Sequence, residues 1–207
     1  MAPSDAREPF MHIPWAARLL NKPGTVTRIA GSRKPKASTE DSLFAEVLKT
    51  DRTIRSCLSF HPRPEPEDAA ITEIHTLMIV GNGMNGHPAI MHGGIVASII
   101  DEAMGILQTA NHERNHLLAV GKGLAQGELP EHGIGSFTAE LKIKYLKPVQ
   151  TPGALIVTAR YTKKEGRKEW IYAEIRQRHG AEEDYDGDEV VCATGEALFI
   201  EPKQSRL

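Results

Sequence analysis

The run best suited to chemistry is 91–103, which reads Met-His-Gly-Gly-Ile-Val-Ala-Ser-Ile-Ile-Asp-Glu-Ala. Two glycines at the start of a helix would let a substrate approach the backbone without obstruction by a Cβ atom. The first N–H groups of a helix lack partners inside it, and its dipole adds partial positive charge. Gly93 and Gly94 could therefore hold a carbonyl oxygen that becomes negative during acyl transfer. Asp101 follows two turns later. If it is buried, its carboxylate must be paired, hydrogen-bonded or functional. A plain glycine turn with Asp101 at an exposed edge of the helix fits the spacing equally well.

One long apolar helix among strands is predicted to position these residues. Apolar side chains recur with helical spacing through 94–109, so this helix must be covered on most of its surface. Strand-like runs lie before and after it, at 74–80, 117–120, 137–146, 154–162, 169–177 and 190–200. Within 137–146 apolar residues alternate with lysines, which is typical of a sheet with one solvated face. The pattern predicts an α+β fold in which an antiparallel sheet wraps around the helix.

Residues 1–70 differ from the rest and are predicted to form an N-terminal extension with short helices, ahead of a main domain at 71–202. Basic residues outnumber acids seven to two up to position 36, as in a mitochondrial transit peptide, but prolines at 14 and 23 interrupt any long amphipathic helix. A short helix is predicted at 38–49. The proline-spaced acidic stretch 61–68 can be neither helix nor central strand, and we place the domain boundary there.

The composition excludes several classes of protein. The 207 residues are 40% apolar and 25% charged, the balance of a globular chain. No apolar run approaches the roughly 20 residues that a membrane-spanning helix needs. Lys plus Arg number 25 against 27 for Asp plus Glu, so no basic field exists to hold a nucleic acid. Cys57 and Cys192 stand too far apart in the chain for a Cys-rich zinc site or a disulfide framework, which favours a reducing compartment.

Two motifs resemble one family. His92-Gly93-Gly94 with Asp101 nine residues after the histidine resembles the hotdog-fold acyl-CoA thioesterases, in the branch of the phenylacetate-pathway thioesterase and the human thioesterase superfamily members. The run from Thr138 to Pro148 is similar to that branch's strand, which begins at a catalytic Ser or Thr and ends in Tyr-x-x-Pro. The resemblance covers residues 71–201. It implies a hotdog fold and hydrolysis of an acyl-CoA, with no metal and with coenzyme A only as part of the substrate.

The resemblance also implies roles for single residues. Asp101 would be the general base or nucleophile, and the Gly93 N–H would polarise the carbonyl while His92 shapes the turn. Thr138 would orient the attacking water or Asp101 itself. In this family Asp101 and the Gly93 donor reach one substrate from different subunits, so the resemblance implies a homodimer or a dimer of dimers.

Substrate-binding residues are expected around this centre. Many relatives carry an Asn six residues before the His, where this chain has Gly86, and Asn85 beside it is the candidate to take that role together with Gly94. Lys144 and Lys147 could meet the phosphates of coenzyme A, or they could be the solvated face of a strand. Residues 121–135 resemble an insertion before the Thr138 strand and could form a lid or a specificity loop.

A rival motif is His112-Glu113-Arg114-Asn115-His116, which matches the His-Glu-x-x-His pattern of zinc peptidases. It follows Ala110-Asn111, where the apolar helix is predicted to end, and no third ligand stands at a recognised spacing. Two further alternatives keep the fold: an enzyme that releases product from an acyl-carrier protein or a polyketide synthase, and a non-catalytic acyl-binding protein.

The chain ends in Ser205-Arg206-Leu207, close to the Ser-Lys-Leu peroxisomal address read by an import receptor. Peroxisomes handle acyl-CoA, which agrees with the predicted substrate. A peroxisomal location is therefore expected for the native terminus of a eukaryotic protein, with the cytoplasm or the mitochondrion as alternatives.

Overall fold

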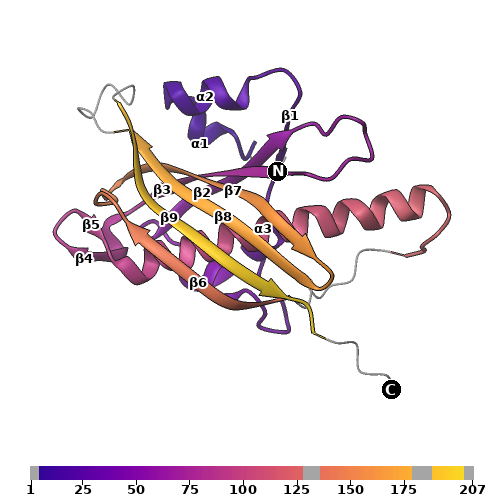
Figure 1. Ribbon diagram of the computed structural model, residues 1–207. Helices are drawn as coiled ribbons and strands as arrows, with labels where there is room; N and C mark the ends of the chain where they lie inside the picture. Colours follow the sequence, from indigo (N-terminus) through magenta and orange to yellow (C-terminus); the bar gives the residue numbers. More distant parts are fainter. Residues whose placement is uncertain (1–4, 128–135, 179–187, 203–207) are drawn as a thin grey trace.

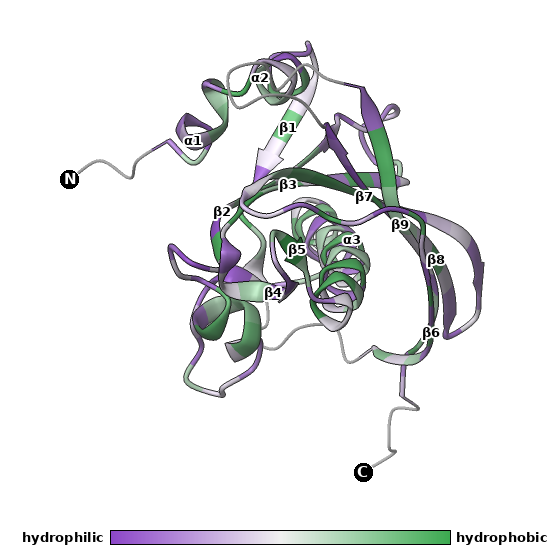
Figure 2. Cartoon of the chain, turned by 90° about the vertical axis from the view of Figure 1, so that its left-hand side faces the viewer, coloured by the Kyte–Doolittle hydropathy of each residue, from purple (hydrophilic) through white to green (hydrophobic). Residues whose placement is uncertain are grey.

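The computed structural model describes residues 5–127, 136–178 and 188–202. Seven antiparallel strands form one sheet in the order β1-β2-β3-β7-β8-β9-β6. Their bounds are Thr25–Arg28 (β1), Ile54–Pro62 (β2), Glu73–Val80 (β3), Phe137–Tyr145 (β6), Gly153–Glu165 (β7), Lys168–Arg178 (β8) and Glu189–Ile200 (β9). The sheet curves around helix α3, Gly93–Gly121 (Figure 1; Figure 2). An antiparallel sheet wrapped around one long helix is the hotdog fold, so the predicted architecture is confirmed.

The apolar stripe of α3 fixes the helix inside the sheet. Ile99, Ile100 and Met104 are fully buried in the main core, and burial of such side chains contributes about 1.5–3 kcal/mol each. Strand β9 comes close to the helix at Gly195, where a Cβ atom would lie only 2.5 Å from Cγ2 of Ile100. This close packing of Ile100 against β9 fixes the rotation of the helix about its axis, and therefore the direction in which the following residue, Asp101, faces.

Helix α3 is longer than predicted. It continues to Gly121, so the strand predicted at 117–120 is wrong. Contacts with distant segments hold the extra turns: Arg28 donates to Glu113 at 2.6 Å, and Nε of Arg114 donates to the backbone oxygen of Ala69 at 2.9 Å. Within the described ranges no helix, α3 included, is long and apolar enough to span a membrane.

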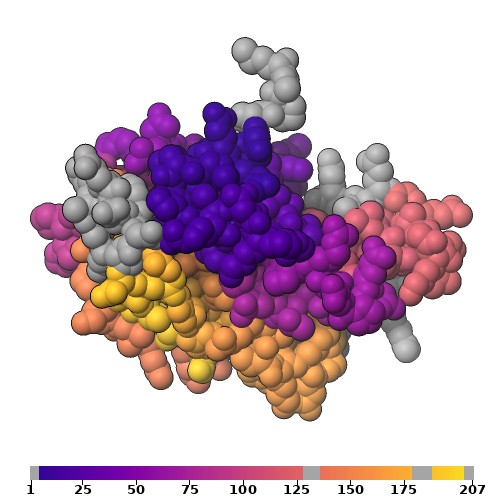
Figure 3. Space-filling view, turned by 90° about the horizontal axis from the view of Figure 1, so that it is seen from above, coloured from indigo at the N-terminus to yellow at the C-terminus, as the bar shows by residue number. Residues whose placement is uncertain are grey.

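Two short helices confirm the N-terminal helical segment. Helices α1, Glu8–Met11, and α2, Pro14–Leu20, lie on the outer face of the sheet, opposite α3 (Figure 1; Figure 3). They form a second core with β2, β3 and β7, made of Phe10, Ile13, Trp15, Ala16, Leu20, Leu58, Phe60, Leu77, Ala154 and Ile156. This part of the sheet is therefore covered on both faces.

The first 70 residues also supply two strands. Strand β1 pairs with β2, and β2 pairs with β3 of the main sheet. Ala30, Phe44 and Leu48 join the same core as α3. The N-terminal region is thus continuous with the hotdog sheet. The prediction that the proline-rich stretch 61–68 contains no central strand is wrong for His61 and Pro62, because they end β2 and pair with β1.

Short elements complete the chain: η1 (Gly31–Arg33), the π-helical turn η2 (Leu43–Val47), η3 (Asn82–Met84), and a small hairpin of β4 (Asn85–His87) and β5 (Ile90–Met91). The helix predicted over 38–49 is confined to η2. Thr39 and Asp41 have φ values of 65° and 62°, a left-handed backbone that is incompatible with a helix running through them. Phe44 packs into the core, whereas Leu43 and Val47 are exposed.

Candidate active site

The start of α3 presents free backbone donors. His92 is the N-cap residue, with an extended backbone (φ −62°, ψ 135°), and its Nδ1 accepts a hydrogen bond from the Gly94 N–H at 3.0 Å. The N–H of Gly93 makes no hydrogen bond among the described residues, as expected for the first position of a helix. His92 therefore caps the helix and leaves the Gly93 donor available to a ligand.

Tyr145, at the end of β6, joins this helix start. Its hydroxyl donates to the backbone oxygen of Gly93 at 2.9 Å, and its ring is exposed. The sequence pointed to Tyr145 only as part of the Tyr-x-x-Pro run, because alternation along a strand does not reveal a contact with a helix 52 residues away. The contact ties the last residue of β6 to the first residue of α3.

A cavity of about 400 Å³ opens beside Gly93. Its walls are mostly apolar and are formed by His87, Ile90, Met91, Gly93, Val96, Tyr145, Leu146, Lys147, Pro148, Val149 and Ala193. One of the two predicted phosphate-binding lysines, Lys147, therefore lies at the cavity, whereas Lys144 is exposed on β6 and does not line it. Such a cavity suits an elongated ligand with few polar groups.

Asp101 and Thr138 meet about two turns further along the helix. The hydroxyl of Thr138, at the start of β6, donates to Oδ1 of Asp101 at 2.9 Å. Asp101 is half-buried, and this burial raises the pKa of its carboxyl group, an effect that the Thr138 hydrogen bond partly opposes. The structure thus brings together the two polar residues that the sequence placed in the catalytic centre.

Asp101 and Gly93 lie apart within one chain. Eight residues of helix separate them, which corresponds to about 12 Å along the axis. The cavity beside Gly93 is not lined by Asp101 or Thr138. One chain alone therefore does not bring the carboxylate and the Gly93 donor to the same carbonyl group.

Asn85 lies on the β4–β5 hairpin, where it pairs with Met91. Its Oδ1 accepts a hydrogen bond from the Thr151 hydroxyl, and Asn85 does not line the cavity beside Gly93. The neighbouring Gly86 packs against His92, since a Cβ atom at Gly86 would lie 3.0 Å from that imidazole ring. In this chain Gly86 provides room for the histidine.

Comparison with known proteins identifies the segment that carries these groups. Residues 89–183, which include Gly93, Asp101 and Thr138, match the sequence model of the Thioesterase superfamily. This match covers 95 of the 207 residues. The strands β1, β2 and β3 and helices α1 and α2 of the hotdog fold described above precede the matched segment.

A curated relative and several solved structures are similar to this chain. An uncharacterized protein of Schizosaccharomyces pombe, C26H8.11c, is 25% identical over 122 residues, which are 59% of this chain and 56% of that protein. The chain thus spans little more than half the length of this relative. Zebra fish thioesterase superfamily member 2 is 15% identical with a TM-score of 0.45 over 65% of this chain and 78% of that one. An acyl-CoA hydrolase of Staphylococcus aureus is 18% identical with a TM-score of 0.45 over 62% and 65%.

The residues of the zinc-peptidase pattern do lie on a helix, contrary to the prediction that the helix ends before them. Glu113 is held by Arg28 at 2.6 Å, and Nε2 of His116 lies 3.3 Å from the backbone oxygen of Gly127. Across the described part of the chain, no three His, Cys, Asp or Glu side chains are grouped so that they could hold a metal ion. The pattern is engaged in contacts with neighbouring segments.

Glu102 is a buried carboxyl group next to Asp101 that the sequence did not single out. The Ser32 hydroxyl donates to its Oε1. Burial, with a smaller contribution from Asp41 and Asp101, raises the pKa of Glu102 to about 7, and the Ser32 hydrogen bond and Arg33 oppose the rise. The sequence held a signal for Glu102, because this acidic residue stands in an apolar helix between Asp101 and Ala103, and Ala103 is fully buried.

Glu102→Gln is expected to stabilise the protein at alkaline pH. At pH values between 4.5, the ordinary pKa of a glutamate, and about 7, Glu102 of the folded chain holds a proton that the unfolded chain has released. The free energy of unfolding therefore falls as the pH rises through this range. The substitution should raise that free energy by up to about 3 kcal/mol near pH 8 and change it little near pH 4. Urea unfolding at both pH values measures this. Glu46→Gln, the same change at an exposed position, should alter stability by less than about 0.5 kcal/mol at either pH; equal effects of the two substitutions would contradict the account.

Proposed function

We propose that this protein is an acyl-CoA thioesterase, which hydrolyses an acyl-CoA to the free acid and coenzyme A. The observation that carries the proposal is the hydrogen bond from Thr138 to Asp101 at 2.9 Å, inside the segment that matches the Thioesterase superfamily. The match to the superfamily supports thioester hydrolysis in general. The acyl-CoA substrate and the roles of single residues are part of the proposal.

In the proposed reaction a water molecule attacks the thioester carbonyl carbon. Asp101 accepts a proton from this water, and Thr138 orients the carboxylate. The carbonyl oxygen becomes negative and is stabilised by the Gly93 N–H at the start of α3. The C–S bond then breaks and the coenzyme A thiolate leaves, which needs little help from an acid because a thiolate is a good leaving group. The proton held by Asp101 is returned to solvent or to the thiolate.

The proposal requires a second copy of the chain. Gly93 and Asp101 lie about 12 Å apart along one helix, so we propose that Asp101 of one subunit and Gly93 of its partner act on one thioester. Strand β6 supports this assembly. It is an edge strand of the sheet, and its residues Phe137 and Tyr145 are 67% and 57% exposed. An open strand edge with large exposed aromatic side chains favours pairing with another strand.

Binding of coenzyme A is proposed at the rim of the cavity beside Gly93. Lys147 lines that cavity, and Lys144 projects from β6 nearby in the chain. Both cations would meet the phosphates of the substrate, and no cofactor beyond the substrate's own coenzyme A is proposed. Most of the predicted 121–135 insertion, at 128–135, lies outside the described residues.

We also propose a peroxisomal location, from the Ser205-Arg206-Leu207 terminus and its import receptor. These three residues lie outside the described ranges. Deletion of the tripeptide from a fluorescent fusion of the full chain should move it from peroxisomes to the cytoplasm; an unchanged distribution would contradict the address.

Thiol release with a colorimetric reagent tests the substrate class. A panel of short, long and aromatic acyl-CoAs is compared with the same acyl groups on an acyl-carrier protein. Turnover of at least one acyl-CoA that chelator leaves unchanged is expected. Turnover of carrier-bound thioesters alone would favour the enzyme that releases a synthase product, and loss of activity with chelator would favour a metal-dependent hydrolase.

Thr138→Val is expected to shift the pH dependence of hydrolysis. The hydroxyl of Thr138 stabilises the charged form of Asp101 and lowers its pKa. Loss of this charge-assisted hydrogen bond should raise the pKa of Asp101 and move the acid limb of kcat/KM to higher pH. Thr138→Ser keeps the hydroxyl and should leave the limb in place. A limb that stays unchanged in the valine variant would show that Asp101 is not the titrating base.

A further inference from the structure

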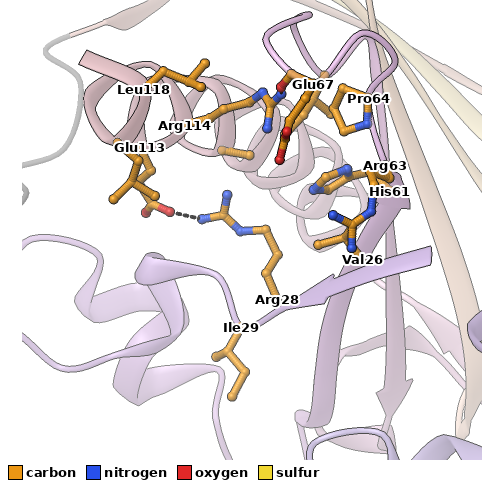
Figure 4. A pocket seen from close by; sticks show the side chains of 13 residues that line it. Val26, Arg28, Ile29, His61, Arg63, Pro64, Glu67, Glu113, Arg114 and Leu118 are labelled. Atoms are coloured by element: carbon orange, nitrogen blue, oxygen red, sulfur yellow. Dashed lines mark hydrogen bonds and ion pairs between the residues drawn. The ribbon is translucent and has the colours of Figure 1, made fainter. Parts of the chain in front are cut away.

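A second cavity, of about 460 Å³, lies at the other end of α3 (Figure 4). It is lined by Val26, Arg28, Ile29, His61, Arg63, Pro64, Glu67, Ile71, Ala110, Glu113, Arg114, Leu117 and Leu118. The helix residues that line the cavity run from Ala110, nine positions after Asp101, to Leu118. The cavity therefore lies about 14–25 Å beyond Asp101 along the helix axis. Half of its wall comes from β1, the end of β2 and the proline-rich stretch, all outside the segment that matches the superfamily. The cavity is therefore separate from the proposed catalytic site.

Much of the wall of this cavity is apolar. Val26, Ile71, Ala110 and Leu118 contribute hydrocarbon surface, and the volume falls within the range of about 300–1,000 Å³ that is usual for small-molecule sites. Ile29 at the mouth is 51% exposed. Leu117 also lines the cavity and is 62% exposed. It lies four residues after Glu113, the ion-pair partner of Arg28. Large apolar side chains left exposed at a cavity mouth indicate contact with an apolar ligand.

The charged groups of the cavity leave one positive charge without a matching carboxylate. Three arginines face two glutamates across it: Arg28, Arg63, Arg114, Glu67 and Glu113. Only Arg28 is neutralised directly, by Glu113 at 2.6 Å (Figure 4).

The other two guanidinium groups are available to an anion. Arg114 is held by backbone oxygens, those of Ala69 at 2.9 Å and of Glu67, which orient the side chain without cancelling its charge. The side chain of Arg63 is exposed and makes no hydrogen bond or ion pair within the described part of the chain. In Figure 4 the Arg28 guanidinium extends toward Glu113 on α3, and that of Arg114 lies beside Glu67.

His61 adds no further charge to the cavity. Its Nδ1 lies 2.7 Å from the backbone oxygen of Pro62. Burial lowers the pKa of His61, and the nearby cations Arg28 and Arg114 lower it further, while the contact with Pro62 opposes the change. The imidazole is therefore neutral at pH 7, and the lining keeps a single excess positive charge, which suits a monoanion better than a phosphate dianion.

We propose that this cavity is a second ligand site, which binds a free fatty acid or a closely similar carboxylate with an apolar chain. The carboxylate would lie between Arg63 and Arg114, since guanidinium groups pair with carboxylates through parallel N–H···O bonds. The hydrocarbon chain would lie along Val26, Ile71 and Leu118. The site is independent of the proposed hydrolysis, although a fatty acid could also be a product of that reaction.

Calorimetric titration of the full chain with decanoate tests the site without turnover. Decanoate is expected to bind, decanol at least tenfold more weakly, and acetate not measurably, because both the charge and the chain are required. Arg63→Gln and Leu117→Gln should each weaken decanoate binding about tenfold. Both side chains are exposed, so neither substitution endangers the fold. Arg55→Gln is the matched control, an exposed arginine on β2 that lies roughly 26 Å from Arg63 along the strand direction.

The same variants separate this site from the catalytic cavity. Arg63→Gln and Leu117→Gln should hydrolyse a thioester substrate at the wild-type rate while they lose decanoate affinity. Unchanged decanoate affinity in both variants would overturn the proposal, because the ligand would then bind elsewhere. Absence of decanoate binding, equal binding of decanol, or displacement of decanoate by millimolar inorganic phosphate would also overturn it.

Discussion

Asp101→Asn is expected to lower kcat for thioester hydrolysis by about 10²–10⁴-fold, the usual contribution of a general base. Asparagine has the shape of aspartate and keeps an oxygen that can accept the Thr138 hydrogen bond, but it cannot take a proton from water. The substitution also removes a charge that is half-buried, so the free energy of unfolding should stay the same or rise. Thiol release under saturating substrate, together with urea unfolding, measures both effects.

The matched control is Glu140→Gln, on the same strand as Thr138. Glu140 is exposed and pairs with Lys142 at 3.0 Å, so the substitution makes the same chemical change outside the proposed site. Its kcat should stay within about twofold of wild type, since exposed ion pairs contribute little. An Asp101→Asn variant that retains wild-type kcat would show that another group is the base.

Gly93→Pro is expected to lower kcat by about 10²–10³-fold, the usual effect of losing one oxyanion donor. Proline has no N–H, and this position is one where the helix tolerates it. Gly93 is the first residue of α3, where no intrahelical bond is lost. The preceding His92 has the extended backbone that a following proline requires. The substitution therefore removes the proposed donor with little cost to the helix.

Gly93→Ala separates the donor from the space around it. Alanine keeps the N–H, and its Cβ would lie 3.4 Å from the Tyr145 hydroxyl, which is an ordinary contact. The alanine variant should lose less than about tenfold in kcat, far less than the proline variant. Equal losses of kcat in the two variants would mean that the site needs the space left by the missing side chain at Gly93 and not its N–H.

The sequence was sufficient to predict the central helix and the strands that follow it. The apolar spacing through 94–109 and the alternation along 137–146 result from burial, which local sequence records directly. The end of the helix was missed because its last turns are held by Arg28 and Ala69, which are distant in the chain. Strand β1 was missed because four residues carry too little periodicity to distinguish a strand from a loop.

The candidate site was predictable only in part. Asp101 and Thr138 were named through a family resemblance, and the structure brings them within hydrogen-bond distance. The roles of Tyr145 and Glu102 depend on contacts with Gly93 and Ser32, which no local pattern encodes. Lys144 and Lys147 have the same residue type and similar spacing, yet only Lys147 lines the cavity, because a strand sends its side chains to alternate faces until it ends at Tyr145.

Mixing the two inactive variants tests most directly whether Asp101 and Gly93 of different subunits act on one thioester. Asp101→Asn and Gly93→Pro chains are co-refolded in equal amounts and assayed for thiol release. In a symmetric dimer half of the assemblies would be mixed, and each would contain one site with an intact Asp101 and an intact Gly93. The account predicts recovery of about one quarter of wild-type activity. A mixture as inactive as its two components, while wild-type and inactive chains demonstrably exchange subunits, would contradict a shared site.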